Sequence, residues 1–146
     1  MANKSTQQLL ESCLFFTVGK LNRILIKITE EEFHFTGLSP TYGFLLMAVN
    51  EKGEISQKEL GEILHLTPST VSRFIEKLKM KHLVTSKQEG RTSIIVPTDK
   101  GLQLQKVLES AWDNTHQRYS DIIGKEEGDQ ITALINEIGK KLENQT

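Results

Sequence analysis

The segment from Pro68 to Met80 combines small hydroxyl side chains with basic side chains at helical spacing. At about 100° per residue, its apolar side chains gather on one arc, which consists of Val71, Phe74, Ile75 and Leu78. The opposite arc and its flanks hold Ser69, Thr70, Ser72, Arg73, Glu76, Lys77 and Met80. Small hydroxyls permit close approach to bases and phosphates, and an arginine can pair with guanine O6 and N7 or with a phosphate. The segment therefore predicts a helix that reads the major groove of DNA, with a plain amphipathic surface helix as the alternative.

Two helix starts separated by a short turn would position this segment. Ser56 and Glu59 are spaced as a capping box, which predicts a short helix ahead of the turn. That helix is expected to face inward with Leu60, Ile63 and Leu64. Thr67 as cap and Pro68 in the first turn then start the second helix. Two short helices, each with its own start signal, are typical of a helix-turn-helix.

A β-hairpin is predicted directly after the second helix. Residues 82–87 and 92–96 have the composition of strands, and residues 88–91 form a tight turn in which Gly90 is free to adopt positive φ. Lys87 lies on the incoming strand and Arg91 at the tip. A basic residue on a protruding loop can enter the minor groove, where the potential is most negative. The alternative is a turn that is only solvated.

Long apolar stripes lie outside the helix-turn-helix. Residues 5–33 are predicted to form one helix, residues 99–123 another that ends at Gly124, and residues 126–143 a last one. A lobe of ~50 residues would not cover these stripes, so we expect them to be buried against a second copy of the chain. The alternative is that these helices fold back on their own lobe.

The expected fold is mainly α with a small β-hairpin wing, in a single domain over residues 1–146. Within it, residues 38–97 are expected to form a winged helix-turn-helix lobe, which includes a helix from Pro40 to about Gly53. Residues 1–35 and 99–146 are expected to form the dimerisation helices.

The charges are unevenly distributed along the chain. Residues 56–106 contain nine basic and five acidic residues, a net charge of +4, whereas the rest contains nine basic and fourteen acidic residues, a net of −5. A basic centre suits contact with phosphates. The net charge of −1 for the whole chain favours the alternative function, a winged-helix module that binds protein and no DNA.

Several other classes of protein are not indicated. No apolar run reaches the ~18–20 residues that span a bilayer, and the first residues lack the features of a signal peptide, so we expect a cytoplasmic protein without membrane contact. The four histidines lie far apart, and no Gly-rich phosphate loop, nucleophile elbow or carboxylate pair is present. We therefore expect no metal, no cofactor, no catalytic residues and no enzyme activity.

The chain resembles the MarR-type (multiple-antibiotic-resistance regulator) winged helix-turn-helix transcription factors. The resemblance is carried by residues 56–64 (SQKELGEIL), residues 66–78 (LTPSTVSRFIEKL), Leu83-Val84 and residues 97–101 (PTDKG), and by the order of the helices. It implies a homodimer with interlocked terminal helices that reads a pseudo-palindromic operator, more often as a repressor. The hairpin departs from the family pattern, because it is a few residues shorter and offers only Glu89-Gly90-Arg91.

The candidate DNA-binding residues follow from the segment and the resemblance together. They are Thr67, Ser69, Thr70, Ser72, Arg73, Lys77, Lys87 and Arg91. The family pattern places Ser69, Thr70, Ser72 and Arg73 toward the groove, and Arg91 on the wing. The resemblance also implies a small aromatic or anionic effector, although core packing explains the same aromatic residues.

Cys13 is the single cysteine of the chain. Some relatives sense organic hydroperoxides through a cysteine in the first helix, at about this place. The neighbouring Phe15-Phe16-Thr17 lacks the tyrosines that support such a thiol, and no basic residue lies within one turn. A small buried hydrophobic side chain is therefore the favoured interpretation of Cys13.

Overall fold

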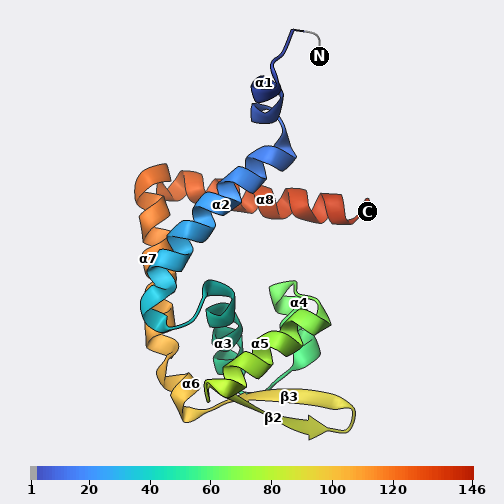
Figure 1. Cartoon of the computed structure of the whole chain (residues 1–146), viewed down its shortest axis with the longest axis vertical. Helices are drawn as coiled ribbons and strands as arrows, with labels where there is room; N and C mark the ends of the chain where they lie inside the picture. The colour runs from blue at the N-terminus through green and yellow to red at the C-terminus, as the bar shows by residue number, and fades with distance from the viewer. Residues whose placement is uncertain (1–2) are drawn as a thin grey trace.

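The chain folds into a long helical arm and a smaller lobe that carries a β-ribbon (Figure 1). The computed structural model describes residues 3–146. The arm contains α1 (Thr6–Glu11), α2 (Leu14–Phe33), α7 (Gln105–Ile123) and α8 (Lys125–Glu143). The lobe contains α3 (Pro40–Lys52), β1 (Ile55–Ser56), α4 (Gln57–Leu64), α5 (Pro68–Met80), β2 (Val84–Glu89) and β3 (Thr92–Pro97). A 3-10 turn (His34–Thr36) and the short helix α6 (Asp99–Gln103) connect the two parts.

The core of the lobe is formed by aliphatic side chains from every one of its helices. The fully buried members are Leu45, Leu46, Val49, Ile55, Leu60, Val71, Ile75, Leu78, Val84 and Ile95. Each such side chain stabilises the fold by about 1.5–3 kcal/mol relative to an exposed position. Because three of them belong to α5, this helix is held to the lobe along one face.

The predicted helix-turn-helix is confirmed, with two differences in detail. Among the described residues, the predicted capping box is present as one hydrogen bond, in which Ser56 Oγ accepts from the backbone N–H of Glu59 at 3.1 Å. Ile63 was expected to face inward, but 46% of its surface is exposed. Leu60 is buried and Leu64 half-buried, so α4 uses a narrower apolar stripe than the sequence indicates.

The wing is a three-stranded antiparallel sheet in the order β1-β3-β2. β1 is a two-residue strand that the sequence did not indicate, with Ile55 opposite Ile95 on β3. β2 begins at Val84 and not at His82, because His82 adopts φ 61° and its N–H bonds to Lys79 O at the end of α5. The strands pair as far as Glu89 and Thr92, so the turn is shorter than predicted.

The predicted helix over residues 5–33 is wrong in one respect, since it is broken between α1 and α2. Ser12 ends α1, and its hydroxyl donates to Gln8 O and Leu9 O, both at 3.1 Å. A serine that bonds back to the preceding turn competes with the backbone and favours a helix end. Cys13 follows in an extended conformation as the residue before α2, and it is only partly buried, contrary to expectation.

The predicted helix over residues 99–123 is also divided, at Leu104. Thr98 caps its start as predicted, with Oγ1 accepting from Gly101 N at 3.0 Å, and Gly124 ends α7 with φ 101°. Between them, Leu104 N bonds to Gly101 O, three residues back, so the chain tightens into a 3-10-type turn that separates α6 from α7. α6 therefore stays with the lobe while α7 packs along α2.

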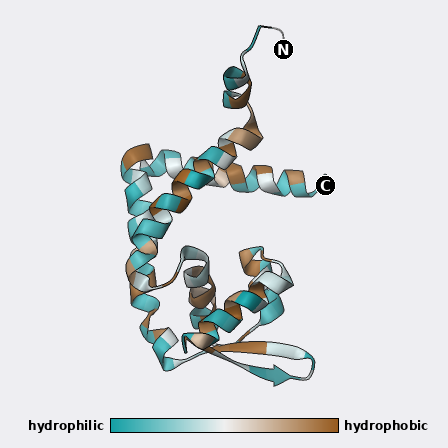
Figure 2. Cartoon of the chain, in the orientation of Figure 1, coloured by the Kyte–Doolittle hydropathy of each residue, from teal (hydrophilic) through white to brown (hydrophobic). Residues whose placement is uncertain are grey.

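The arm leaves a large apolar surface uncovered. More than two fifths of the residue surface is exposed at Leu14, Val18, Ile24, Ile26, Ile122, Ile123, Ile131, Leu134, Ile135 and Leu142. Figure 2 shows hydrophobic stretches along α2 and α8. α8 buries Gly128 alone and packs on α7. Contiguous exposed apolar surface of this kind marks an interaction site. Across residues 3–146, the helices all fall short of the length and apolar character needed to cross a membrane.

Candidate nucleic-acid interface

The helix α5 has the two faces that the sequence predicts. Val71, Ile75 and Leu78 are buried in the core, and the half-buried Phe74 stacks on Tyr42 at 4.1 Å between ring centroids. The opposite face is solvent-exposed over Ser69, Ser72, Arg73, Glu76, Lys77 and Met80, with Thr70 half-buried. The apolar anchor thus leaves a continuous hydroxyl-and-cation surface free.

Three hydroxyl groups gather at the start of α5. Thr67 precedes the helix as predicted, but its side chain makes no capping bond to the backbone. Its Oγ1 lies 2.8 Å from Thr70 Oγ1 and 3.4 Å from Ser69 Oγ. The first turn of a helix has unpaired N–H groups and a partial positive charge. A phosphate or a base edge at this end would therefore meet both backbone and hydroxyl donors.

Gln57 is a residue of this surface that the sequence reasoning missed. It is the first residue of α4, and its Nε2 donates to Ser72 Oγ at 2.5 Å. Because the Ser72 hydroxyl accepts this bond, its own proton is free to point toward an outside acceptor. The contact joins two helices across the turn, so no local sequence signal indicates it.

The two cations of α5 are restrained by aromatic rings. The Arg73 guanidinium lies 5.6 Å from the centroid of the Phe74 ring, and Lys77 Nζ lies 5.2 Å from that of Tyr42. Cations over aromatic rings are attracted by the ring quadrupole, by about 0.5–1 kcal/mol at exposed sites. Both side chains are therefore biased toward these half-buried rings, at the edge of the exposed face.

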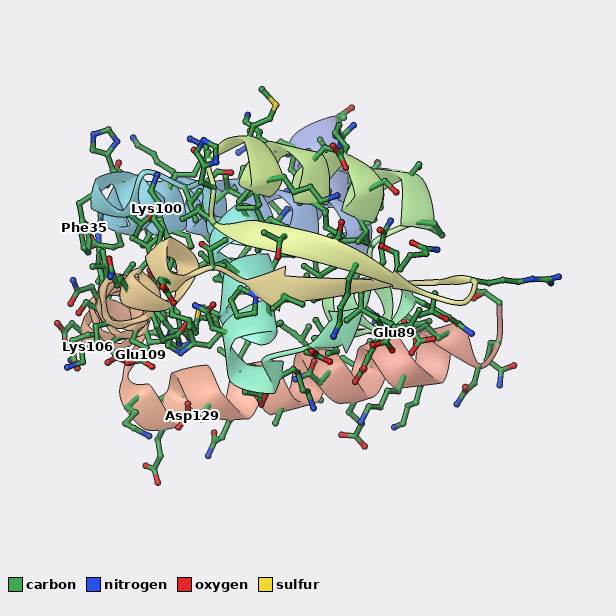
Figure 3. All side chains as sticks on the ribbon, turned by 90° about the horizontal axis from the view of Figure 1, so that it is seen from below. Phe35, Glu89, Lys100, Lys106, Glu109 and Asp129 are labelled. Carbon is green, nitrogen blue, oxygen red and sulfur yellow. The ribbon has the colours of Figure 1, made fainter. Side chains whose placement is uncertain are left out.

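The two basic residues of the wing have different surroundings. Lys87 Nζ donates to Glu54 Oε1 at 2.6 Å and lies 3.5 Å from Glu89 Oε1. The bond to Glu54 raises the pKa of Lys87 above its ordinary value. Glu89 lies near the free end of the hairpin (Figure 3). Two carboxylates thus offset the charge of Lys87 before any ligand arrives.

Arg91 lies at the turn of the hairpin, next to Gly90, whose φ is 62°. It is exposed, and within residues 3–146 no carboxylate forms an ion pair with it. A groove of about 760 Å³ separates the hairpin from α4 and the start of α5. Gln57, Lys58, Pro68, Arg91 and Ser93 are among its lining residues. The first turns of both helices and the wing cation therefore border one concave surface.

Comparison with known proteins connects this surface to a family. The sequence pattern of the MarR family matches residues 38–90, from α3 to the wing. The HTH-type transcriptional regulator YybA of Bacillus subtilis, itself uncharacterised, is 25% identical over 129 residues, which cover 86% of each chain.

Two solved structures show the same fold. A putative MarR family regulator from Listeria monocytogenes, complexed with 26mer DNA, superposes with a TM-score of 0.76 at 22% identity over 92% of this chain and 91% of that one. CouR from Rhodococcus jostii RHA1, bound to p-coumaroyl-CoA, superposes with a TM-score of 0.77 at 20% identity over 88% and 93%. The likeness extends over the arm as well as the lobe.

Proposed function

The chain belongs to the MarR family of transcription regulators, and on this premise we propose that it is a repressor that binds a specific duplex DNA as a homodimer. The observation that carries the proposal is α5, which is anchored by Val71, Ile75 and Leu78 and presents hydroxyl and basic side chains on its free face. Such a helix can enter a major groove while the lobe holds its orientation.

The proposed contacts fall into those that can read bases and those that bind the phosphate backbone. Thr67, Ser69 and Thr70 contact phosphates or base edges at the start of α5, and Ser72 and Arg73 follow along the groove. Lys77 contributes a phosphate contact, which positions the helix without reading sequence. Arg91 enters the minor groove, and Lys87 adds charge at the base of the wing. The Listeria relative was solved in complex with 26mer DNA, which supports DNA as the binding partner.

A second copy of the chain is the proposed cover for the apolar arm. In this arrangement residues 38–97 are the reading lobe, and residues 1–35 and 99–146 are the dimerisation helices. The two copies of α5 would then lie about one DNA turn apart, or ~34 Å, on a pseudo-palindromic site. Occupying a promoter site of this kind excludes polymerase, which is the proposed basis of repression. The proposed function includes no enzyme activity.

A small aromatic or anionic effector is the proposed signal. The ligand of CouR, p-coumaroyl-CoA, is both aromatic and anionic, and this supports the class of molecule. An effector that binds one separation of the two lobes better than another shifts the population toward that separation. If that separation does not fit the operator, effector binding weakens DNA binding, and DNA weakens effector binding by the same coupling free energy.

The test is fluorescence anisotropy with duplexes from the region upstream of its own gene, over a salt series. We expect specific binding that weakens steeply as salt rises, because released counterions drive phosphate contacts. Uniformly weak binding to every duplex, together with capture of a protein partner that survives nuclease treatment, would instead favour the protein-binding alternative.

A further inference from the structure

The joint between lobe and arm, formed by α6 and the start of α7, has one side that is bonded to the lobe and one that is packed in the arm. α6 is tied to the end of α5, because Thr98 N bonds to Leu83 O at 3.1 Å and Thr98 Oγ1 to His82 O at 2.6 Å. Lys100 Nζ adds a bond to Lys81 O at 3.0 Å. In Figure 3 the joint, between Lys100 and Lys106, lies at the opposite end of the molecule from Glu89 and the hairpin turn.

The other side of the joint belongs to the arm. α7 packs along α2, where Arg118 Nη1 lies 2.8 Å from Glu31 Oε2 and 3.1 Å from Glu32 Oε2. Leu104 separates the two helices, as the last residue of the turn after α6 and the residue before α7. Any rotation of the lobe against the arm must therefore pass through this residue or through the 3-10 turn before α3.

Asn50 of α3 bridges the two sides. Its Nδ2 donates to Gly101 O on α6 at 3.0 Å and to Gln105 Oε1 on α7 at 2.9 Å. Among residues 3–146, Asn50 is the one residue of the lobe whose side chain hydrogen-bonds to both α6 and α7. Both protons of its amide are used, whereas its buried Oδ1 has no hydrogen-bond partner among the described residues.

Apolar side chains also pack between lobe and arm. The rings of Phe44 and Trp112 meet at 5.4 Å, as do those of Phe33 and Phe44, and Leu108 is buried beside them. Apolar burial is non-directional and tolerates sliding, whereas a hydrogen bond weakens steeply as its angle departs from linear. The bond from Asn50 to Gln105 crosses the joint, and the bond to Gly101 holds Asn50 in place on the lobe side. Together they therefore define the angle of the joint more sharply than the surrounding apolar side chains.

We propose that Asn50 is a positioning residue that fixes the angle between the reading lobe and the arm, and thereby the half-site spacing that the dimer accepts. The proposal rests on the proposed function, because spacing has meaning only for a DNA-binding dimer. Each base pair added between half-sites rotates the second one by about 35° around the duplex. If the joint is rigid, the second lobe cannot reorient to the rotated half-site and binding weakens. If the joint is loose, the lobe can reorient and binding is retained.

Asn50→Leu removes the two bonds and also the buried oxygen without a partner. Gly101 O keeps its bond from Leu104 N, and Gln105 keeps its bond to Glu109, so the variant is expected to fold. Gln105→Ala breaks the bridge from the other side and serves as a second variant. Asn114→Leu makes the same change at an exposed position of α7 and is the matched control.

The experiment measures affinity for a set of duplexes whose half-sites are separated by one or two base pairs more or fewer than the preferred spacing. We expect the unmodified chain to lose about tenfold or more in affinity at two base pairs, because the DNA must be deformed to fit. In Asn50→Leu and Gln105→Ala this loss shrinks to about threefold or less, and the double variant adds nothing further. Asn114→Leu keeps the original profile.

A second readout does not depend on DNA. A spin label at Glu62→Cys, in a Cys13→Ser background, reports the distance between the two lobes of a dimer. We expect a broader distance distribution in Asn50→Leu than in Asn114→Leu. Unchanged spacing profiles and unchanged distances in Asn50→Leu and Gln105→Ala would overturn the role of Asn50. If the unmodified chain binds no duplex, the proposed function fails, and the spin-label distances alone decide whether Asn50 holds the joint.

Discussion

At the scale of single residues, side chains of the same charge on α5 are suited to different tasks. Arg73 has a planar guanidinium with several donors, which suits two acceptors on one base. Lys77 is a point charge on a flexible stem, which suits a phosphate. Both are exposed on α5, and both lie near an aromatic ring. Their difference is therefore one of chemistry and not of location.

Arg73→Ala should cost about 1–3 kcal/mol of binding free energy on the preferred operator and relax the choice of base at one position in each half-site. Anisotropy with the operator and its single-base variants measures both effects. Lys77→Ala is the comparison, because removing a cation that binds phosphate should weaken all duplexes alike. Unchanged affinity and base preference in Arg73→Ala would remove this residue from the site.

Arg91→Ala is expected to weaken binding more than Lys87→Gln does, because Glu54 and Glu89 already offset the charge of Lys87. Plotting the logarithm of affinity against the logarithm of salt concentration separates the two. The slope should fall by about 0.9 for every phosphate that is no longer neutralised, and we expect this change for Arg91→Ala. A larger change for Lys87→Gln would mean that its ion pairs open on DNA.

At the scale of secondary-structure elements, helix starts that depend on local residues can be predicted from the sequence, whereas the helix breaks cannot. The starts at Pro68 and Thr98 are predictable, since proline and a capping hydroxyl act within one turn. The breaks after Ser12 and at Leu104 contain neither proline nor glycine, so the sequence carries no strong signal for them. The one-helix predictions fail there for that reason.

The candidate site shows the same division. The exposed face of α5 follows from helical periodicity, so its residues can be named from the sequence. The bond from Gln57 to Ser72 and the ion pair of Lys87 with Glu54 join residues 15 and 33 positions apart. They depend on the packing of α4 against α5 and on the pairing of β1 with β3. No local pattern contains that information.

Gly101→Ala tests the contact between α6 and the end of α5. A Cβ at this position would overlap Leu83 O, a backbone atom that also accepts from Thr98 N. We expect a loss of about 1–3 kcal/mol in the free energy of unfolding, measured by urea denaturation. Gly128→Ala is the control, since its Cβ would lie 3.8 Å from Tyr119 and alanine favours a helix by up to about 1 kcal/mol. Equal stability of the two variants would contradict the described packing of α6.

At the scale of the whole molecule, the proposed second copy of the chain accounts for the exposed apolar surface of the arm. One chain exposes apolar side chains along α2 and α8 while its lobe is well packed. Because α6 connects the arm to the lobe, the proposed dimer would transmit a change at its interface to the spacing of the two copies of α5. Assembly and DNA recognition are therefore expected to fail together.

Leu134→Glu tests this link. Leu134 lies on α8 and is 55% exposed in the single chain, so the substitution should leave the fold of each chain intact. A charge at this position should prevent the arms from joining, because a buried unpaired carboxylate is strongly unfavourable. Sedimentation velocity should show monomers, and operator affinity should fall to the level of nonspecific duplex. A dimer of unchanged strength would place the interface elsewhere.

Recognition by a dimer through α5 is tested most sharply by selecting bound fragments from a random duplex pool with the unmodified chain and sequencing them. We expect enrichment of a pseudo-palindrome whose half-sites lie about 10–10.5 base pairs apart, each contacted by one α5. Enrichment should disappear when the pool is presented to a chain that lacks both Arg73 and Arg91. A pool that stays random with the unmodified chain, or an enriched motif without two-fold symmetry, would contradict this mode of recognition.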